Sequence, residues 1–147
     1  MNYILSMPRL IHCVYCFKDK LRNMKTDIKN RVDIERIVNL FYEKVRKDAS
    51  IGFFFTEIAQ TNWERHLPIM YQFWENIVFS TGTYEGNPMI KHREISQIKP
   101  ITMDHFQHWI HLFNETVNEL FQGEKAELIK QRAQSIATVM QIKLINQ

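Results

Sequence analysis

The stretch Gly86-Asn87-Pro88-Met89-Ile90-Lys91-His92 is the most informative part of this 147-residue sequence. Asn87 is a residue type that caps helix N-termini. Pro88 suits the first helical position, because the N–H that proline lacks would have no partner there anyway. The pair therefore predicts a short helix of one or two turns that holds the imidazole of His92 in a fixed direction.

Composition indicates one ordered domain. The length allows one sizeable core but makes two domains improbable, and only four Gly and four Pro indicate long helices with few tight turns. The net charge of +3 arises from 19 basic and 16 acidic residues without a dense basic block, which argues against nucleic-acid binding. No run of about 18 apolar residues occurs, so we expect no membrane segment.

Apolar residues recur at spacings of three and four along most of the chain and predict an all-α fold. Asp33 is the expected N-cap of the first long helix, and Thr61-x-x-Glu64 resembles a capping box that would start the second. A third long helix is expected to begin at Thr102, and the last one to cover residues 125–144. The expected inward stripes are Ile34, Ile37, Val38, Phe41 and Val45 in the first helix and Phe106, Trp109, Ile110, Phe113, Val117 and Leu120 in the third.

Residues 1–23 differ from the rest, because their basic cluster follows the apolar part, the reverse of a secretory signal. We expect either a poorly ordered extension or upstream sequence translated from an early start codon, with the domain over residues 24–147. Cys13 and Cys16 lack the following His of a c-type haem attachment and the second pair of a zinc site. A free pair fits a reducing compartment, and we predict a cytoplasmic protein.

Aromatic residues are abundant, with ten Phe, five Tyr and three Trp, and such rings suit the lining of a flat ligand. Haem iron takes a neutral imidazole nitrogen, while a carbonyl or carboxylate holds the other ring nitrogen. His92 fits that role, although beside Lys91 and Arg93 it also fits a surface position. A haem-free helical interaction or regulatory module would use the same helices and remains the alternative.

Three further histidines, His105, His108 and His111, are spaced by three in the third long helix. No cysteine or carboxylate completes a metal site with them. With Trp109 facing inward, we expect these imidazoles mainly on the outer or flanking faces of the helix.

Several stretches share an order and spacing that is more specific than any one of them. They are Leu40–Asp48, Ile51–Phe55, Trp63–His66, Phe73-Trp74, Gly86–His92, Phe106-x-x-Trp109 and Gln131–Ala133. Together they cover nearly all of residues 24–147, and from Met24 onward the chain resembles the group III truncated haemoglobins of bacteria. The low glycine content fits as well, since this group lacks the Gly-Gly pairs common in the other truncated groups.

The resemblance implies a two-over-two helical sandwich around haem b. By likeness, His92 is the proximal iron ligand and Phe55 stacks on the haem. The resemblance also implies polar residues on the opposite, distal side and an apolar remainder of the pocket. The distal residues are Tyr42, His66 and Trp109, and the other pocket residues are Met70, Trp74 and Phe106.

Two further points of the resemblance are less specific. Arg65, Lys91 and Arg93 are candidates for the haem propionates by their charge alone. The family commonly has proline where this chain has Phe53, and we expect the change to loosen that corner without touching a ligand.

The resemblance implies reversible binding of O₂ and of other diatomic ligands, NO and CO, at a five-coordinate iron. Hydrogen bonds from Tyr42 and Trp109 would each contribute about 1.5–3 kcal/mol to holding O₂, so release would be slow. Slow release suits sensing, or chemistry on O₂, NO or peroxide, better than transport. Activity of the NO dioxygenase or peroxidase kind would need an external reductase, because the sequence has no Gly-rich dinucleotide loop.

Overall fold

The computed structural model describes residues 25–145, with side chains to residue 144, and every regular element in that part of the chain is helical. The predictions for residues 1–23, including those for Cys13 and Cys16, lie outside the described residues. Within residues 25–145, no helix combines the length and apolar character needed to cross a bilayer. The elements are α2 (Arg31–Lys47), the π-helix η1 (Phe54–Ile58), α3 (Trp63–Phe79), α4 (Pro88–Ile98), α5 (Met103–Leu120) and α6 (Glu124–Ile145).

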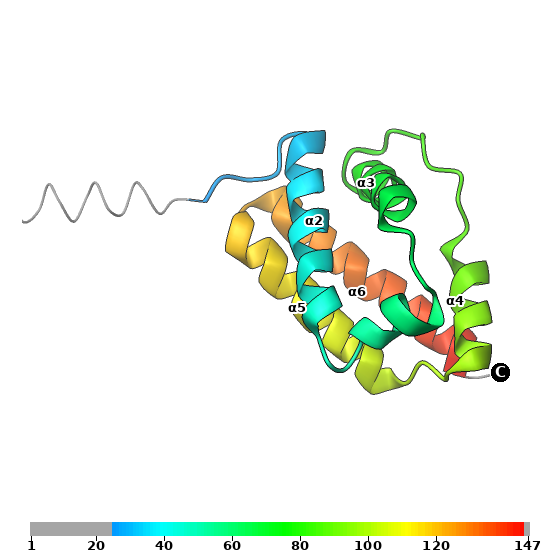
Figure 1. Cartoon of the computed structure of the whole chain (residues 1–147). Coiled ribbons are helices and arrows are strands. Elements are labelled where there is room, and N and C mark those ends of the chain that lie inside the picture. Colours follow the sequence, from blue (N-terminus) through cyan, green and yellow to red (C-terminus); the bar gives the residue numbers. More distant parts are fainter. Residues whose placement is uncertain (1–24, 146–147) are drawn as a thin grey trace, which may run out of the picture.

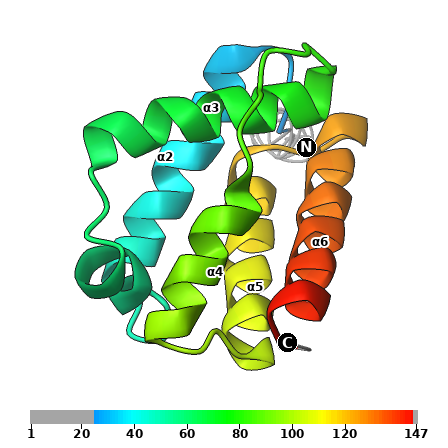
Figure 2. The ribbon, with the colours of Figure 1, turned by 90° about the vertical axis from the view of Figure 1, so that its right-hand side faces the viewer.

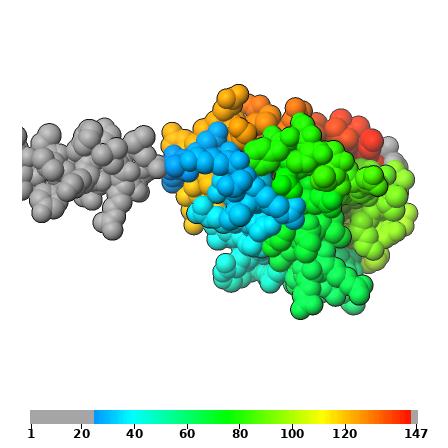
Figure 3. Space-filling view, turned by 90° about the horizontal axis from the view of Figure 1, so that it is seen from above, coloured from blue at the N-terminus to red at the C-terminus, as the bar shows by residue number. Residues whose placement is uncertain are grey.

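Four long helices form two layers. α2 packs against α3 and α5 packs against α6, while α2 also contacts α5 and α3 contacts α6 (Figure 1). This arrangement is the two-over-two sandwich that the resemblance implied, and the all-α prediction is confirmed. Seen from the side, α3 crosses the top of the molecule and α4 stands in front of α5 (Figure 2). The view from above shows the green side chains of α3 between the blue start of α2 and α4 (Figure 3).

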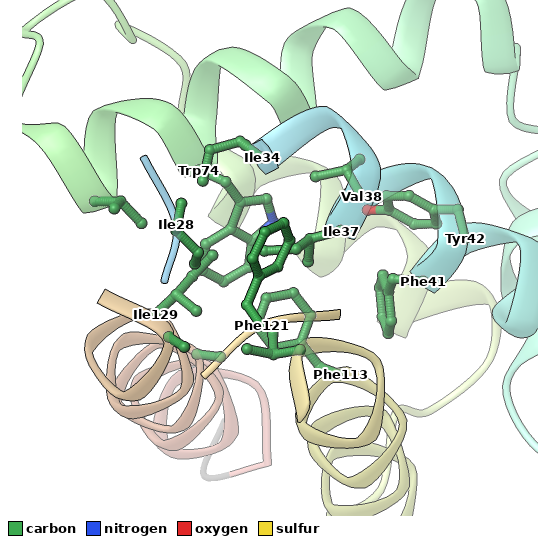
Figure 4. Close-up of a cluster of buried hydrophobic side chains, with 14 of the residues drawn as sticks. Ile28, Ile34, Ile37, Val38, Phe41, Tyr42, Trp74, Phe113, Phe121 and Ile129 are labelled. Atoms are coloured by element: carbon green, nitrogen blue, oxygen red, sulfur yellow. The ribbon is translucent and has the colours of Figure 1, made fainter. Parts of the chain in front are cut away.

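The predicted stripe of α2 forms the centre of the core. Each of its five apolar members is buried, and Tyr42, expected at the edge of the stripe, is only 5% exposed. The stripe packs against rings from the neighbouring helices, among them Trp74 of α3 and Phe113 of α5 (Figure 4). Tyr42 lies at one end of this cluster, while Ile28 and Ile129 lie toward the other end. The core therefore fixes the position of the Tyr42 ring.

The predicted caps of α2 and α3 were wrong by one to three residues. Asn30, not Asp33, caps α2 and accepts a hydrogen bond from the Asp33 N–H at 3.3 Å. The Asp33 carboxylate instead reaches back to the N–H of Lys29 at 2.9 Å. Asn62, not Thr61, caps α3. At each helix start two polar residues are able to cap. In both cases the asparagine immediately before the first helical residue is the one that caps.

The helix that carries His92 begins as predicted but is longer. Asn87 is the N-cap of α4 and accepts from the Met89 N–H at 3.0 Å, and Pro88 occupies the first turn. α4 has 11 residues instead of one or two turns, and none of them is fully buried. It contacts η1 and α6. Its N-terminus is therefore fixed mainly by local capping.

Asp27 ties the segment before α2 to the start of α6. Its carboxylate accepts hydrogen bonds from the N–H groups of Lys125 and Ala126 at 2.9 Å each, and from Ile28 at 2.8 Å. Burial alone would raise the pKa of Asp27, but these hydrogen bonds outweigh burial and lower it. Gly123 has φ +148°, and a Cβ there would overlap the Asp27 side chain. This junction therefore requires glycine.

Candidate functional site

One cavity of about 500 Å³ lies between α3, α4, α5 and η1, with residues of α2 and α6 contributing to its wall. Its volume is in the range of small-molecule and cofactor pockets. The predicted site residues come from five separate segments of the sequence, and the fold brings all eight residues to this cavity. The predicted residues that line it are Tyr42, Phe55, His66, Met70, Trp74, His92, Phe106 and Trp109.

His92 is oriented by its own helix. Its Nδ1 lies 2.7 Å from the carbonyl oxygen of Pro88, one helical turn earlier. A carbonyl can only accept, so Nδ1 carries the proton and donates it, which leaves the lone pair on Nε2. Among residues 25–144, no group hydrogen-bonds to Nε2. Burial lowers the pKa of His92, although the bond to Pro88 opposes this, so the ring stays neutral near pH 7. An imidazole held in this way is the usual form of a metal ligand.

Tyr42 and His66 form a hydrogen-bonded pair at another part of the wall. The Tyr42 hydroxyl and His66 Nε2 are 3.1 Å apart, and the two rings meet edge to face with centroids 5.2 Å apart. Burial raises the pKa of Tyr42 well above its usual range, so the phenol keeps its proton. Burial, and to a lesser degree the nearby His92, lowers the pKa of His66. Both members are therefore neutral near pH 7.

Trp109 stands in a stack of aromatic rings. Its ring is nearly parallel to that of Phe113, with centroids 5.4 Å apart, and Phe113 stacks in turn on Trp74 at 4.6 Å. Phe41 meets Trp109 edge to face at 5.3 Å. Within residues 25–144, the indole N–H of Trp109 has no hydrogen-bond partner. The stack fixes a half-buried donor at the cavity wall.

Phe55 reaches the cavity from η1. Its ring meets Tyr42 edge to face, with centroids 5.7 Å apart. Phe53 precedes η1 with φ −62°, a value that a proline ring would also impose. Its ring stacks on Phe54 at 4.2 Å, so phenylalanine contributes packing where the family commonly has proline. Whether the corner is looser remains a prediction for experiment.

Two of the three cations chosen by charge border the cavity. Arg65 of α3 and Lys91 of α4 line it, whereas Arg93 does not. An anionic group in the cavity could therefore pair with a guanidinium from α3 and an ammonium from α4. This places Arg65 and Lys91 ahead of Arg93 as partners for carboxylates.

The three histidines of α5 are used in different ways. They were expected mainly on the outer or flanking faces of the helix, but His105 contributes to the cavity wall. His105 lines the cavity, and its Nδ1 accepts a hydrogen bond from the Thr102 N–H at 3.0 Å, which caps α5. His108 pairs with Asp48 at 2.7 Å and links α5 to the end of α2. His111 is exposed and lies 3.7 Å from Glu115. The three rings thus do not converge on one point.

Sequence reasoning missed part of the cavity wall. Tyr84, in the loop before α4, lines it and packs edge to face on Phe73 with centroids 5.0 Å apart. Gly86 permits this, because a Cβ at that position would overlap the Tyr84 ring. Ile136 and Met140 of α6 line the cavity as well. Other lining residues outside the prediction are Ile51, Phe54, Ile69, Ile95 and Ile101.

The residues present fit a haem. The wall is mostly apolar and aromatic, as a porphyrin face requires. One neutral imidazole has its Nδ1 fixed and, within residues 25–144, no partner on its Nε2, and two cations, Arg65 and Lys91, line the cavity and suit carboxylates such as propionates. An all-helical two-over-two sandwich with such a cavity defines a haem-binding globin.

Comparison with known proteins gives the same class. Residues 27–143 match the model of the bacterial-like globin family, and the chain belongs to this family. It is 34% identical over 121 residues to the group 3 truncated hemoglobin ctb of Campylobacter jejuni, covering 80% of this chain and 93% of that protein. The crystal structure of a group III truncated hemoglobin from Campylobacter jejuni matches with a TM-score of 0.71 at 34% identity, over 82% of this chain and 95% of that one. The resemblance to group III truncated haemoglobins is therefore confirmed, and the family implies a haem cofactor and small diatomic ligands such as O₂.

Proposed function

We propose that this protein binds haem b through His92 and holds O₂ by hydrogen bonds from the distal side of the cavity. When bound, the haem supplies an iron that binds diatomic molecules. The observation that carries the proposal is the geometry of His92, whose Nδ1 donates to the Pro88 carbonyl and whose Nε2 has no partner among residues 25–144. Arg65 and Lys91 would hold the propionates.

Tyr42 is the proposed principal donor to O₂. Its hydroxyl has one proton, and its partner His66 decides where that proton points. When His66 Nε2 carries hydrogen, it donates to the Tyr42 oxygen and leaves the phenol proton free for the ligand. Because burial raises the pKa of Tyr42, the phenol keeps this proton across the neutral pH range.

Trp109 is the proposed second donor. Its indole N–H can only donate, and stacking on Phe113 leaves the ring little freedom to turn. A ligand that gains negative charge benefits from both donors, whereas CO, which is less polar, gains little. The arrangement therefore favours tight O₂ binding with slow release, which suits sensing, or chemistry on O₂, NO or peroxide, better than transport.

The first test is spectroscopic. The protein expressed with haem supplied should purify red, with a Soret band and a five-coordinate ferrous spectrum. A colourless protein that binds no added haem would instead favour the haem-free interaction module.

The second test addresses the donor. Tyr42→Phe removes the hydroxyl but keeps the ring, and the loss of one buried hydrogen bond should raise the O₂ dissociation rate about ten- to a hundred-fold. The rate is measured by stopped-flow displacement of O₂. Tyr71→Phe is a matched control, since Tyr71 is a partly buried tyrosine of α3 whose hydroxyl bonds Asn39 and which does not line the cavity. An unchanged rate in Tyr42→Phe would show that this phenol does not donate.

A further inference from the structure

Trp63 contacts three residues of the proposed site, although it does not itself line the cavity. Its ring lies 5.5 Å from Tyr42, 5.9 Å from His66 and 6.1 Å from Phe55, measured between centroids. The contact with His66 is edge to face, and the contact with Phe55 is nearly parallel. Trp63 is the only residue outside the cavity lining that makes aromatic contacts with all three, within residues 25–144.

Arg46 packs on the Trp63 ring from α2. Its guanidinium carbon lies 3.9 Å from the ring centroid, which is the geometry of a cation–π contact. Arg46 is exposed and forms no ion pair within residues 25–144. The neighbouring Lys47 is bound to Glu43 instead, at 2.7 Å. The guanidinium of Arg46 is therefore directed to the indole and to solvent.

Helix geometry explains why these contacts occur together. Tyr42 and Arg46 are four residues apart in α2, and Trp63 and His66 are three apart in α3, so each pair shares one helix face. Because α2 and α3 pack on each other, the two faces meet. The inner residues, Tyr42 and His66, form the hydrogen bond, and the outer residues, Arg46 and Trp63, form the cation–π contact.

We propose that Trp63, held by Arg46, is a positioning residue that sets the rings of Tyr42 and His66 for hydrogen bonding to the haem ligand. The direction of a phenol O–H follows from where its ring is placed, and that of His66 Nε2 from how its ring is turned. Trp63 contacts both rings and restricts their movement toward its side. The inference rests on the proposed role of Tyr42 as donor.

The test uses the haem-loaded protein with carbon monoxide and O₂ as probes. Trp63→Ala should move the C–O stretching band toward that of Tyr42→Phe and raise the O₂ dissociation rate severalfold. Trp63→Phe should restore both, because it retains a ring. Arg46→Gln should shift both in the same direction by a smaller amount, while the matched control Lys47→Gln should leave them unchanged.

Combining variants separates positioning from stability. If Trp63 acts through Tyr42, the double variant with Tyr42→Phe should release O₂ within about twofold of Tyr42→Phe alone. A Trp63→Ala protein with a lower melting temperature but the wild-type C–O band and O₂ rate would overturn the inference, since Trp63 would then only pack. Should Trp63→Ala fail to fold, Arg46→Gln against Lys47→Gln decides, and equal bands and rates in those two variants overturn it as well.

These outcomes keep the two proposals apart. A Tyr42→Phe protein with unchanged O₂ release would contradict the proposed function, and this inference with it. A Tyr42→Phe effect without effects of Trp63→Ala and Arg46→Gln would contradict the positioning role alone.

Discussion

α2 and α4 each bring one side chain of the proposed site to the cavity, but they hold it in opposite ways. Six residues of α2 are buried, and Tyr42 is fixed by the core around it. No residue of α4 is fully buried, and His92 is fixed by one hydrogen bond to Pro88 and by the Asn87 cap. The proposed donor therefore depends on tertiary packing, whereas the proposed iron ligand depends on local geometry.

The largest effect is expected from His92→Gly, which removes the proposed iron ligand on α4. Without the imidazole we expect loss of haem or of the five-coordinate ferrous spectrum, because no other imidazole is held in the same way on α4. Haem content per chain and the visible spectrum measure the effect, and added imidazole should restore the spectrum in part. His111→Gly, an exposed histidine of α5, should keep full haem content; equal content in both variants would remove His92 from its role.

The stability lost on Ile→Ala substitution, at one position in α2 and one in α4, compares how firmly the two helices are packed. Ile37→Ala empties a fully buried position in α2 and should lower the free energy of unfolding by about 2–5 kcal/mol. Ile98→Ala changes a residue of α4 that is 68% exposed and should stay within about 0.5 kcal/mol of wild type. Chemical denaturation measures both. Similar losses would mean that α4 is embedded more firmly than its exposure indicates.

Acid should lower the stability of the junction between the segment before α2 and the start of α6, because Asp27 accepts the hydrogen bonds there. The folded-state pKa of Asp27 is lowered, so the stability it adds is present above its unfolded value of 3.8 and is lost as pH falls through the folded value. As the pH falls from about 5 through the folded-state pKa, which lies below 3.8, the wild type should lose its advantage over Asp27→Asn, which keeps an acceptor oxygen but no titrating charge. Unfolding curves across this range measure the difference. A constant difference at all pH values would contradict the assignment.

The smallest effect is expected from the α4 cap. Asn87→Ala removes the acceptor for the Met89 N–H and should lower stability by about 1 kcal/mol or less, since helix ends in α4 are exposed. Because the cap holds the turn that orients His92, the variant should also lose haem faster than wild type. Transfer of haem to an apomyoglobin acceptor measures that rate. Asn62→Ala, the cap of α3, is the control for capping away from His92.

Periodicity predicted the core better than it predicted the helix ends. The α2 stripe is buried because spacing alone decides which side faces the other layer. The caps of α2 and α3 were misplaced because Asn30 and Asp33, like Thr61 and Asn62, are all able to cap. Which of the two residues caps depends on the direction of the backbone where it enters the helix, and this cannot be predicted from residue types alone.

The site was predicted where a residue type restricts the chemistry and missed where only packing matters. The Asn87-Pro88 start of α4 could be predicted directly, since capping is local. His92 alone fitted a surface position as well, and its proposed role came from the resemblance. The π-helix η1 has no residue signature of its own, so the wall formed by Phe54 could not be foreseen. Trp63 was recognised only as part of a matching stretch, because its contacts with Tyr42 and His66 arise from the packing of α3 on α2.

The bond from His92 to Pro88 also sets the electron-donating strength of the imidazole. A carboxylate acceptor would draw the Nδ1 proton strongly and make Nε2 a stronger base, whereas a neutral amide carbonyl draws it less. The acceptor here is part of the backbone and cannot titrate. No titration of the acceptor therefore alters the donor strength of Nε2 while α4 stays folded, and the direction of the ring depends on the single helical turn from Pro88 to His92.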